Sequence, residues 1–138
     1  MMNISSTTTR VKERRRIMVV DKDLNMLRFL NHTLDMEGFD TVSVNDSEAA
    51  VHVLGQLEPD MVIMDTVRPG ENAARALDRI RKHSNVPIVV LTSDNEVTAL
   101  KEAFDHGADD FIHKPFGTKL FIARVRAKLR RYHQEIQS

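Results

Sequence analysis

Residues 59–65 read Pro-Asp-Met-Val-Ile-Met-Asp, in which four consecutive apolar residues lie between two aspartates. A short apolar run without alternating polar residues indicates a strand that is covered on both faces of its sheet. Similar runs occur at residues 17–20, 88–91 and 111–113, and a further short strand is predicted at 41–44. These five segments predict a sheet that lies between two layers of helices.

A segment with apolar residues at helical spacing follows each predicted strand. Helices are predicted at residues 24–36, from a cap at Asp46 or Ser47 to residue 57, at 72–82, at 97–106, and from about residue 118 onward. Gly38 suits the end of the first helix, because helices commonly end at a glycine. Strands that alternate with helices in this way predict an α/β fold with a parallel sheet and right-handed crossovers.

The chain has 138 residues, about the length of one domain. Residues 1–14 combine a Ser-Thr run with basic residues and have no apolar stretch to bury, so we expect a disordered N-terminal tail. Residues 15–133 are expected to form the domain, with a core large enough for independent folding. Residues 134–138 are expected to be the start of a linker or a C-terminal tail.

The composition excludes several classes of protein. The absence of cysteine excludes disulfides and thiolate metal sites. No apolar run approaches the roughly 18 residues of a membrane helix, and the N-terminus lacks the apolar centre of a secretory signal, so we expect a cytoplasmic location and no membrane contact. The formal net charge is zero, which argues against a nucleic-acid binder acting through the charge of the whole chain, although residues 124–131 hold five basic residues and no acid.

Polar residues stand at the carboxyl ends of four predicted strands. Asp21 follows the first strand, Asp65 ends the third, Thr92 follows the fourth and Lys114 follows the fifth. Because parallel strands end at the same edge of a sheet, these side chains are expected to meet near the point where the strand order reverses. A carboxylate can attack phosphorus, neighbouring carboxylates can hold a divalent cation, and a lysine and a hydroxyl can hold phosphoryl oxygens.

Each of these residues also has a purely structural interpretation. Asp23 can cap the helix that begins at residue 24, Thr92 can start a turn, and Lys114 can be an ordinary loop lysine. Their joint occurrence at several strand ends is much less expected by chance, which favours the interpretation as a phosphoryl-transfer site.

The stretch from Ile17 to Arg131 resembles the CheY-like receiver domain of two-component response regulators. The motifs that carry the resemblance are residues 18–21 (Met-Val-Val-Asp), 59–65, 68–70 (Arg-Pro-Gly), 86–93 (Val-Pro-Ile-Val-Val-Leu-Thr-Ser) and 107–116 (Gly-Ala-Asp-Asp-Phe-Ile-His-Lys-Pro-Phe). The resemblance implies a flavodoxin-like (βα)5 fold with strand order 2-1-3-4-5 and a cis peptide bond between Lys114 and Pro115.

The resemblance also implies the roles of the site residues. Asp65 is the phosphoacceptor for a sensor histidine kinase, Thr92 is the switch hydroxyl, Lys114 binds the phosphate and Phe111 is the aromatic residue that moves. The implied cofactor is Mg²⁺, with Asp21, Asp65 and the backbone carbonyl of Val67 as ligands. Such a domain is a phosphoacceptor with at most self-phosphorylation and self-dephosphorylation activity, so we do not expect an enzyme in the usual sense.

Lys22 departs from the family pattern, in which a second acid and metal ligand usually follows Asp21. A unit charge at about 5 Å from a divalent ion experiences roughly 2–7 kcal/mol of repulsion, which a flexible lysine reduces by moving away. We therefore expect weakened magnesium binding. In one hypothesis Asp23 or water takes the missing ligand position and phosphorylation persists slowly. In the other, the Lys22 ammonium lies near Asp65 as a fixed counter-charge, and the domain works without metal or without phosphate.

Residues 107–110 and 123–131 most resemble receivers attached to winged-helix DNA-binding domains of the OmpR/PhoB type, so we expect a role in transcription. In that subfamily active dimers pair through the fourth helix, fifth strand and fifth helix, here 97–106, 111–113 and the helix from about 118. Asp109, Asp110 and Arg124 are candidates for ion pairs between subunits, although Arg124 can equally lie on a solvated helix face. DNA would be bound only through an effector domain that this sequence does not contain, so the chain is either a fragment of a longer regulator or a stand-alone receiver.

Two other functions remain open. A pseudo-receiver, which acts as a protein-interaction module with weak or no metal-dependent phosphorylation, is supported by Lys22. A flavin-binding enzyme is less favoured, because it would need phosphate-binding Ser or Thr residues after the first strand, where Lys22-Asp23-Leu24 supplies none. The six histidines show no metal-ligand spacing with carboxylates.

Overall fold

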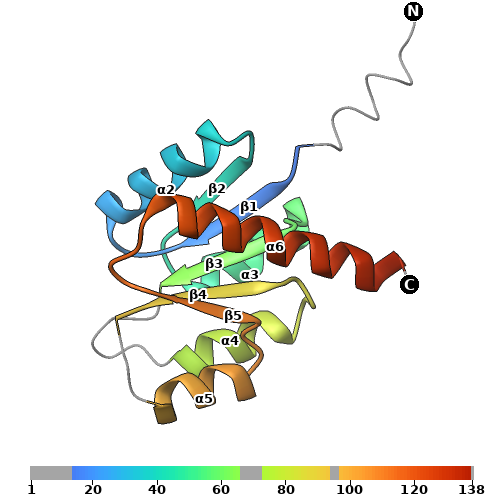
Figure 1. Ribbon diagram of the computed structural model, residues 1–138. Coiled ribbons are helices and arrows are strands. Elements are labelled where there is room, and N and C mark those ends of the chain that lie inside the picture. The colour runs from blue at the N-terminus through green and yellow to red at the C-terminus, as the bar shows by residue number, and fades with distance from the viewer. Residues whose placement is uncertain (1–13, 66–72, 94–96, 138) are drawn as a thin grey trace, which may run out of the picture.

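The computed structural model describes residues 14–65, 73–93 and 97–137 (Figure 1). Five strands alternate with five helices in these residues. The strands are β1 (Arg16–Val20), β2 (Asp40–Val44), β3 (Met61–Asp65), β4 (Ile88–Thr92) and β5 (Asp110–His113), and the helices are α2 (Leu24–Met36), α3 (Ser47–Leu57), α4 (Ala73–Arg81), α5 (Val97–Asp105) and α6 (Thr118–Gln137).

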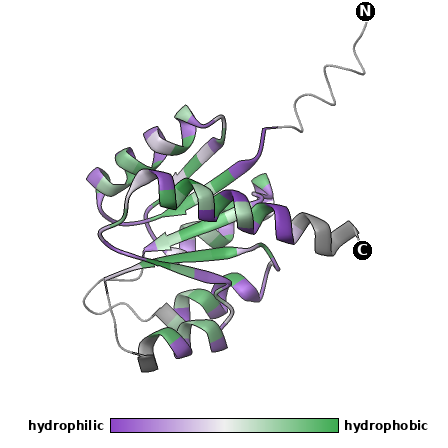
Figure 2. Ribbon diagram, in the orientation of Figure 1, coloured by the Kyte–Doolittle hydropathy of each residue, from purple (hydrophilic) through white to green (hydrophobic). Residues whose placement is uncertain are grey.

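The strands form one parallel sheet in the order β2-β1-β3-β4-β5, which confirms the predicted flavodoxin-like fold. Helices cover both faces of the sheet, with α2 and α6 on the near face in Figure 1. Alternate residues of the central strands enter the two core layers, as Met18 and Val20 pack toward α3 and α4 whereas Ile17 and Val19 pack toward α2 and α6. The central strands β1, β3 and β4 are therefore mostly apolar, as the green colour along much of their length in Figure 2 shows.

The helix boundaries follow from local capping. The Asp46 carboxylate accepts a hydrogen bond from the Ala49 N–H and begins α3, and the Asp23 carboxylate does the same for Asn25 N–H at the start of α2. The Asp46 cap confirms one of the two predicted positions. The helix α6 continues to Gln137, through residues 134–137 that were expected to form a linker or tail.

Strand β1 begins at Arg16, one residue before its apolar run, because the backbone pairing with β2 extends to Asp40. Arg14 donates from Nε to the Asp40 carboxylate at 2.9 Å, and residues 1–13 lie outside the described part of the chain. Among the described residues, no helix is both long enough and apolar enough to span a membrane.

Candidate functional site

The predicted site residues lie at one edge of the sheet. Asp21 follows β1 directly, Asp65 is the last residue of β3, Thr92 is the last residue of β4 and Lys114 follows β5. The register pairs Asp65 with Leu91 and Thr92 with His113 across the central ladders, so these strand ends are neighbours. The Lys114–Pro115 peptide bond is cis, as the sequence predicted.

Lys114 and Asp65 form a close ion pair at this edge. The Lys114 Nζ lies 2.5 Å from the Asp65 Oδ2, and the side chains are 21% and 7% exposed. The Lys114 backbone N–H donates to the Thr92 carbonyl at 2.8 Å, which holds the loop after β5 against the end of β4. A positive charge is therefore fixed against a largely buried carboxylate.

Asp21 is the second carboxylate of the site and is only 2% exposed. Its Oδ1 accepts a hydrogen bond from the Asp23 N–H at 2.9 Å, whereas its buried Oδ2 has no hydrogen-bond partner among the described residues. Burial, together with the nearby Asp65 carboxyl, raises the pKa of Asp21 from 3.8 to about 6, although the Asp23 N–H and the charge of Lys114 oppose this rise. An unpaired buried carboxylate oxygen beside a second carboxylate is a suitable position for a cation.

The donor set for a divalent cation is smaller than the resemblance implies. Asp21 and Asp65 provide carboxylates at the sheet edge, but the position after Asp21 is occupied by the exposed Lys22. The Asp23 carboxylate caps α2, and the predicted carbonyl ligand of Val67 lies outside the described residues. Within the described ranges, no three His, Asp or Glu side chains are grouped to hold a metal ion. Two carboxylates, those of Asp21 and Asp65, can therefore bind a cation here. The site has one acidic residue fewer than the family pattern.

Thr92 is the last residue of β4, and Phe111 lies on β5 in contact with α5. Thr92 is 3% exposed. The Phe111 ring packs edge-on against Phe104 of α5 at 5.5 Å between centroids and against His113 at 5.4 Å. The sequence predicted a role for Phe111, whereas for His113 it indicated only that metal-ligand spacing is absent. The signal that was available for His113 is its position two residues after Phe111, on the same face of β5.

The charged residues of the expected dimer surface have contacts within the chain. Arg81 Nη2 lies 2.9 Å from Asp109 Oδ2, and Arg124 Nη1 lies 3.4 Å from Asp110 Oδ1. Lys128 donates to the Asp109 carbonyl. In the isolated chain these groups therefore stabilise the junction of α4, β5 and α6.

Comparison with known proteins identifies the domain. Residues 17–126 match the response regulator receiver domain family. The chain belongs to this family. The receiver is 41% identical over 122 residues to the DNA-binding response regulator MtrA of Mycolicibacterium paratuberculosis and 40% identical to MtrA of Mycolicibacterium smegmatis. Each alignment covers 88% of this chain and 54% of the relative, so the chain spans about half the length of the curated relatives it matches.

Solved structures agree on the fold of this receiver. A two-component response regulator from Clostridium difficile has a TM-score of 0.81 at 24% identity, covering 86% of this chain and 98% of that one. The receiver domain of the Francisella response regulator 1452 has a TM-score of 0.77 at 24% identity, covering 86% of this chain and 99% of that one. Together with the family match and the MtrA relatives, the fold makes this domain the receiver of a two-component response regulator related to MtrA, which implies a cognate histidine kinase.

Proposed function

We propose that this receiver accepts a phosphoryl group on Asp65 from a sensor histidine kinase. The observation that carries the proposal is the contact of Lys114 Nζ with Asp65 Oδ2 at 2.5 Å, beside the buried Asp21 carboxyl. This arrangement combines a carboxylate nucleophile with a fixed cation that can balance the charge of an incoming phosphoryl group.

In the proposed reaction, an Asp65 carboxylate oxygen attacks phosphorus and forms the acyl phosphate while the bond between phosphorus and the donor breaks. Lys114 binds the transferred phosphoryl oxygens as an ammonium donor, and the Thr92 hydroxyl hydrogen-bonds to them. Asp21 and Asp65, with the Val67 carbonyl, would hold Mg²⁺, which when bound screens the charge between carboxylate and phosphate. The domain is thus a phosphoacceptor, and its chemistry is limited to gaining and losing this group.

The proposed output is a change of the surface formed by α5, β5 and α6. Phe111 lies between Phe104 of α5 and the strand end that carries Lys114, so a change at the site can be transmitted through this ring. We propose that the altered surface pairs two receivers, in which Asp109, Asp110 and Arg124 would exchange their partners within the chain for partners across the dimer. Control of transcription in the cytoplasm would follow through an effector domain, because the MtrA relatives are DNA-binding response regulators.

The second candidate function is a pseudo-receiver that binds partner proteins with weak or no metal-dependent phosphorylation. The observation in its favour is Lys22, which places a basic residue where the family pattern has an acidic ligand. In this alternative the cationic side chains at the sheet edge replace the metal ion as counter-charge to Asp65.

The experiment that separates the two functions is incubation of the 138-residue chain with acetyl phosphate, followed by intact-mass measurement. We expect the wild type to gain the mass of one phosphoryl group in magnesium and to gain much less in EDTA, whereas Asp65→Asn gains none. An unchanged wild-type mass at high magnesium concentration would favour the pseudo-receiver. An equal gain in Asp65→Asn would show that another residue is the acceptor.

A further inference from the structure

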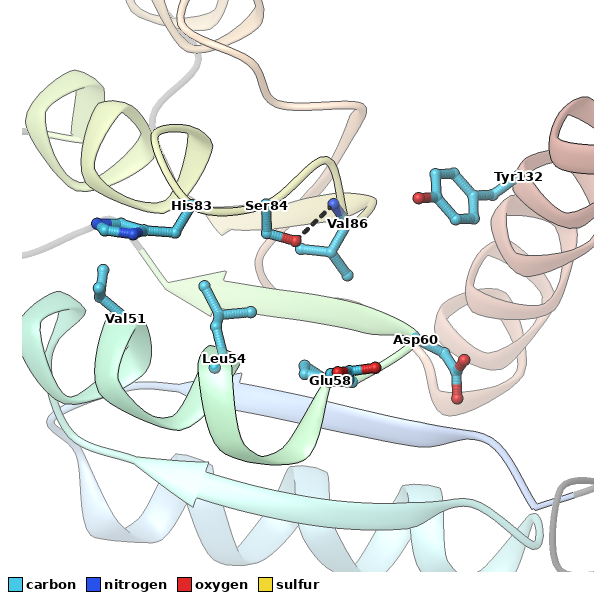
Figure 3. Close-up of a pocket in the computed structure, with 10 residues that line it drawn as sticks. Val51, Leu54, Glu58, Asp60, His83, Ser84, Val86 and Tyr132 are labelled. Atoms are coloured by element: carbon cyan, nitrogen blue, oxygen red, sulfur yellow. Dashed lines mark hydrogen bonds between the residues drawn. The ribbon is translucent and has the colours of Figure 1, made fainter.

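A pocket lies at the opposite edge of the sheet from Asp65. It is formed by the last turn of α3, the loop before β3, the loop before β4 and Tyr132 of α6 (Figure 3). Its volume is about 470 Å³, within the range of roughly 300–1,000 Å³ that is usual for ligand pockets. None of the residues that line it belongs to the proposed phosphoryl site.

The floor of this pocket and the loop above it both contribute apolar side chains. Leu54 and Val86 are each 5% exposed, and the neighbouring Pro59 is buried and Val51 half-buried. Figure 3 shows Leu54 pointing up into the space below the loop that carries Ser84 and Val86. A hydrocarbon chain laid on this floor would be removed from water at about 25 cal/mol per Å² of apolar surface buried.

The rim adds two carboxylates at one end of the pocket. Asp60 accepts a hydrogen bond from the Arg16 N–H at 2.8 Å through Oδ2, which fixes the orientation of the carboxylate. Among the described residues, neither Glu58 nor Asp60 forms an ion pair, and the Glu58 carboxylate has no hydrogen-bond partner. The neighbouring Arg16 guanidinium donates from Nη1 to the Leu57 carbonyl at 3.0 Å and to neither carboxylate. The Tyr132 hydroxyl, which points toward Ser84 and Val86 in Figure 3, also has no partner within the described ranges.

Glu58 is kept at this rim in an unfavourable backbone conformation. Its φ of 47° and ψ of 63° place it in the left-handed region, as the only described residue other than glycine with a positive φ. Helices commonly end with glycine or asparagine in this conformation, because a larger side chain is strained there. The capping geometry alone would favour glycine, so the Glu58 side chain has no evident structural role.

We propose that this pocket binds the side chain of an arginine or lysine residue of a protein partner, with the aliphatic stem on Leu54 and Val86 and the cationic group at Glu58 and Asp60. The two halves of the pocket match the two halves of such a side chain in polarity. The volume exceeds that of one side chain and leaves room for the adjoining backbone. A free polyamine fits less well, because its several ammonium groups would place charge on the apolar floor without a partner.

The test is a titration of the 138-residue chain, observed through backbone amide chemical shifts in NMR. The probe is N-acetyl-arginine N-methylamide, and the matched neutral probe is N-acetyl-citrulline N-methylamide, which has the same shape without the charge. We expect saturable shifts at Gly55, Asp60 and Ser84, with a Kd for the arginine probe at least about fivefold below that for citrulline. Equal Kd values for the two probes, or shifts confined to the Asp65 edge, would overturn the proposal.

Two variants of Glu58 separate ligand binding from folding. Glu58→Gln should remove the preference for arginine over citrulline, whereas Glu48→Gln, which removes the same charge from the first turn of α3, should leave it unchanged. Glu58→Gly should raise the urea midpoint and also abolish the preference, because glycine relieves the backbone strain and lacks the carboxylate. A preference retained in Glu58→Gln, or tighter binding of spermidine than of the arginine probe, would contradict the assignment.

Discussion

At the scale of single residues, Asp21 combines deep burial with an unpaired oxygen. The Asp21 Oδ2 has no hydrogen-bond partner among the described residues, although the side chain is 2% exposed. A buried charge without a full set of partners costs stability, and a bound cation would offset that cost. The position of Asp21 is therefore suited to binding a cation, but in the absence of a cation it lowers the stability of the folded domain.

The raised pKa of Asp21 predicts how stability depends on pH without divalent cations. Because burial raises the pKa in the folded state to about 6, the folded protein binds the proton more tightly than the unfolded chain does. The Asp21 contribution thus becomes less favourable as pH rises through about 6. We expect Asp21→Asn to be more stable than wild type at neutral pH in EDTA, by on the order of 1–3 kcal/mol, with the difference vanishing near pH 4.

Urea unfolding at a series of pH values measures this difference. The exposed Asp35→Asn on α2 is the control and should change stability little at any pH. A difference between Asp21→Asn and wild type that stays constant from acid to neutral pH would contradict this account of Asp21.

His106 gives a second pH dependence. Its cause is a favourable hydrogen bond to Asp78, whereas the cause for Asp21 is burial. The His106 Nδ1 lies 2.7 Å from Asp78 Oδ1, which links α5 to α4. This hydrogen bond, and then the charges of Asp78, Glu102 and Asp105, raise the pKa of His106 above 6.5. The stabilisation is complete below the unfolded pKa of about 6.5 and is lost as pH rises through the folded value. His106→Gln should therefore lower the urea midpoint more in mild acid than in alkaline solution, where the imidazole is neutral.

The partner residue provides the control for His106. Asp78→Asn should cause the same loss in mild acid, and the double variant should lose no more than either single variant. Additive losses would show that the two side chains do not act as a pair.

The sequence predicted the Asp65 edge of the site but not these contacts. Asp21, Asp65, Thr92 and Lys114 follow strands of a parallel sheet, so the topology alone brings them to one edge. His106 and Asp78 lie on two different helices, and nothing in either local sequence indicates their pairing. The role of Lys22 also remains a prediction, because sequence position does not decide where a flexible side chain lies.

Lys22 can be tested through magnesium affinity. Lys22→Asp should tighten binding by roughly tenfold or more, because it removes a positive charge and adds a carboxylate beside Asp21. Isothermal titration calorimetry measures the Kd. Lys82→Asp, at the exposed residue that follows α4, makes the same change of charge at the opposite end of the domain and should have little effect. Equal magnesium affinities in wild type and Lys22→Asp would show that Lys22 does not weaken magnesium binding.

At the scale of elements, Arg81 joins the end of α4 to the start of β5. Its guanidinium donates to the carbonyls of Ser84, Val86 and Gly107 and to the Asp109 carboxylate. Gly107 has a φ of 113°, and a Cβ there would lie 2.8 Å from the Arg81 Cγ and Nε. The glycine is thus required both by its backbone conformation and by the close approach of Arg81.

Gly38 and Gly107, the two glycines with positive φ among the described residues, allow a matched comparison. Gly38 has a φ of 91°, and a Cβ at this position would meet no atom within 4 Å, so Gly38→Ala should cost only the backbone strain of about 1–2 kcal/mol. Gly107→Ala should cost about 2–4 kcal/mol, because the Arg81 hydrogen bonds are disturbed as well. The free energies of unfolding in urea measure both. Equal losses would mean that Arg81 moves aside without cost.

The elements themselves were largely predictable from the sequence. Apolar runs and helical spacing gave all five strands and the described parts of all five helices, with ends that differ by at most a few residues, as at Arg16. The start of β1 differs because its backbone ladder with β2 begins at Arg16, one residue before the first apolar residue. The Arg81 junction was not predictable, because an arginine that binds backbone carbonyls leaves no pattern in the sequence.

At the scale of the whole molecule, the receiver presents different chemistry at the two edges of its sheet. The carboxyl edge holds the Lys114–Asp65 pair, and the opposite edge holds the pocket of Glu58 and Tyr132. Helix α6 spans the molecule between them, since it begins near Lys114 and carries Tyr132 toward its end.

The central claim is that Asp65 is the residue that receives the phosphoryl group. The most direct measurement is to phosphorylate the receiver with acetyl phosphate, reduce the acyl phosphate with borohydride, and locate the altered residue by peptide mass spectrometry. The account predicts reduction to homoserine at position 65 and nowhere else. Modification at another aspartate, such as Asp21 or Asp23, or no modification under conditions that label an active receiver, would contradict it.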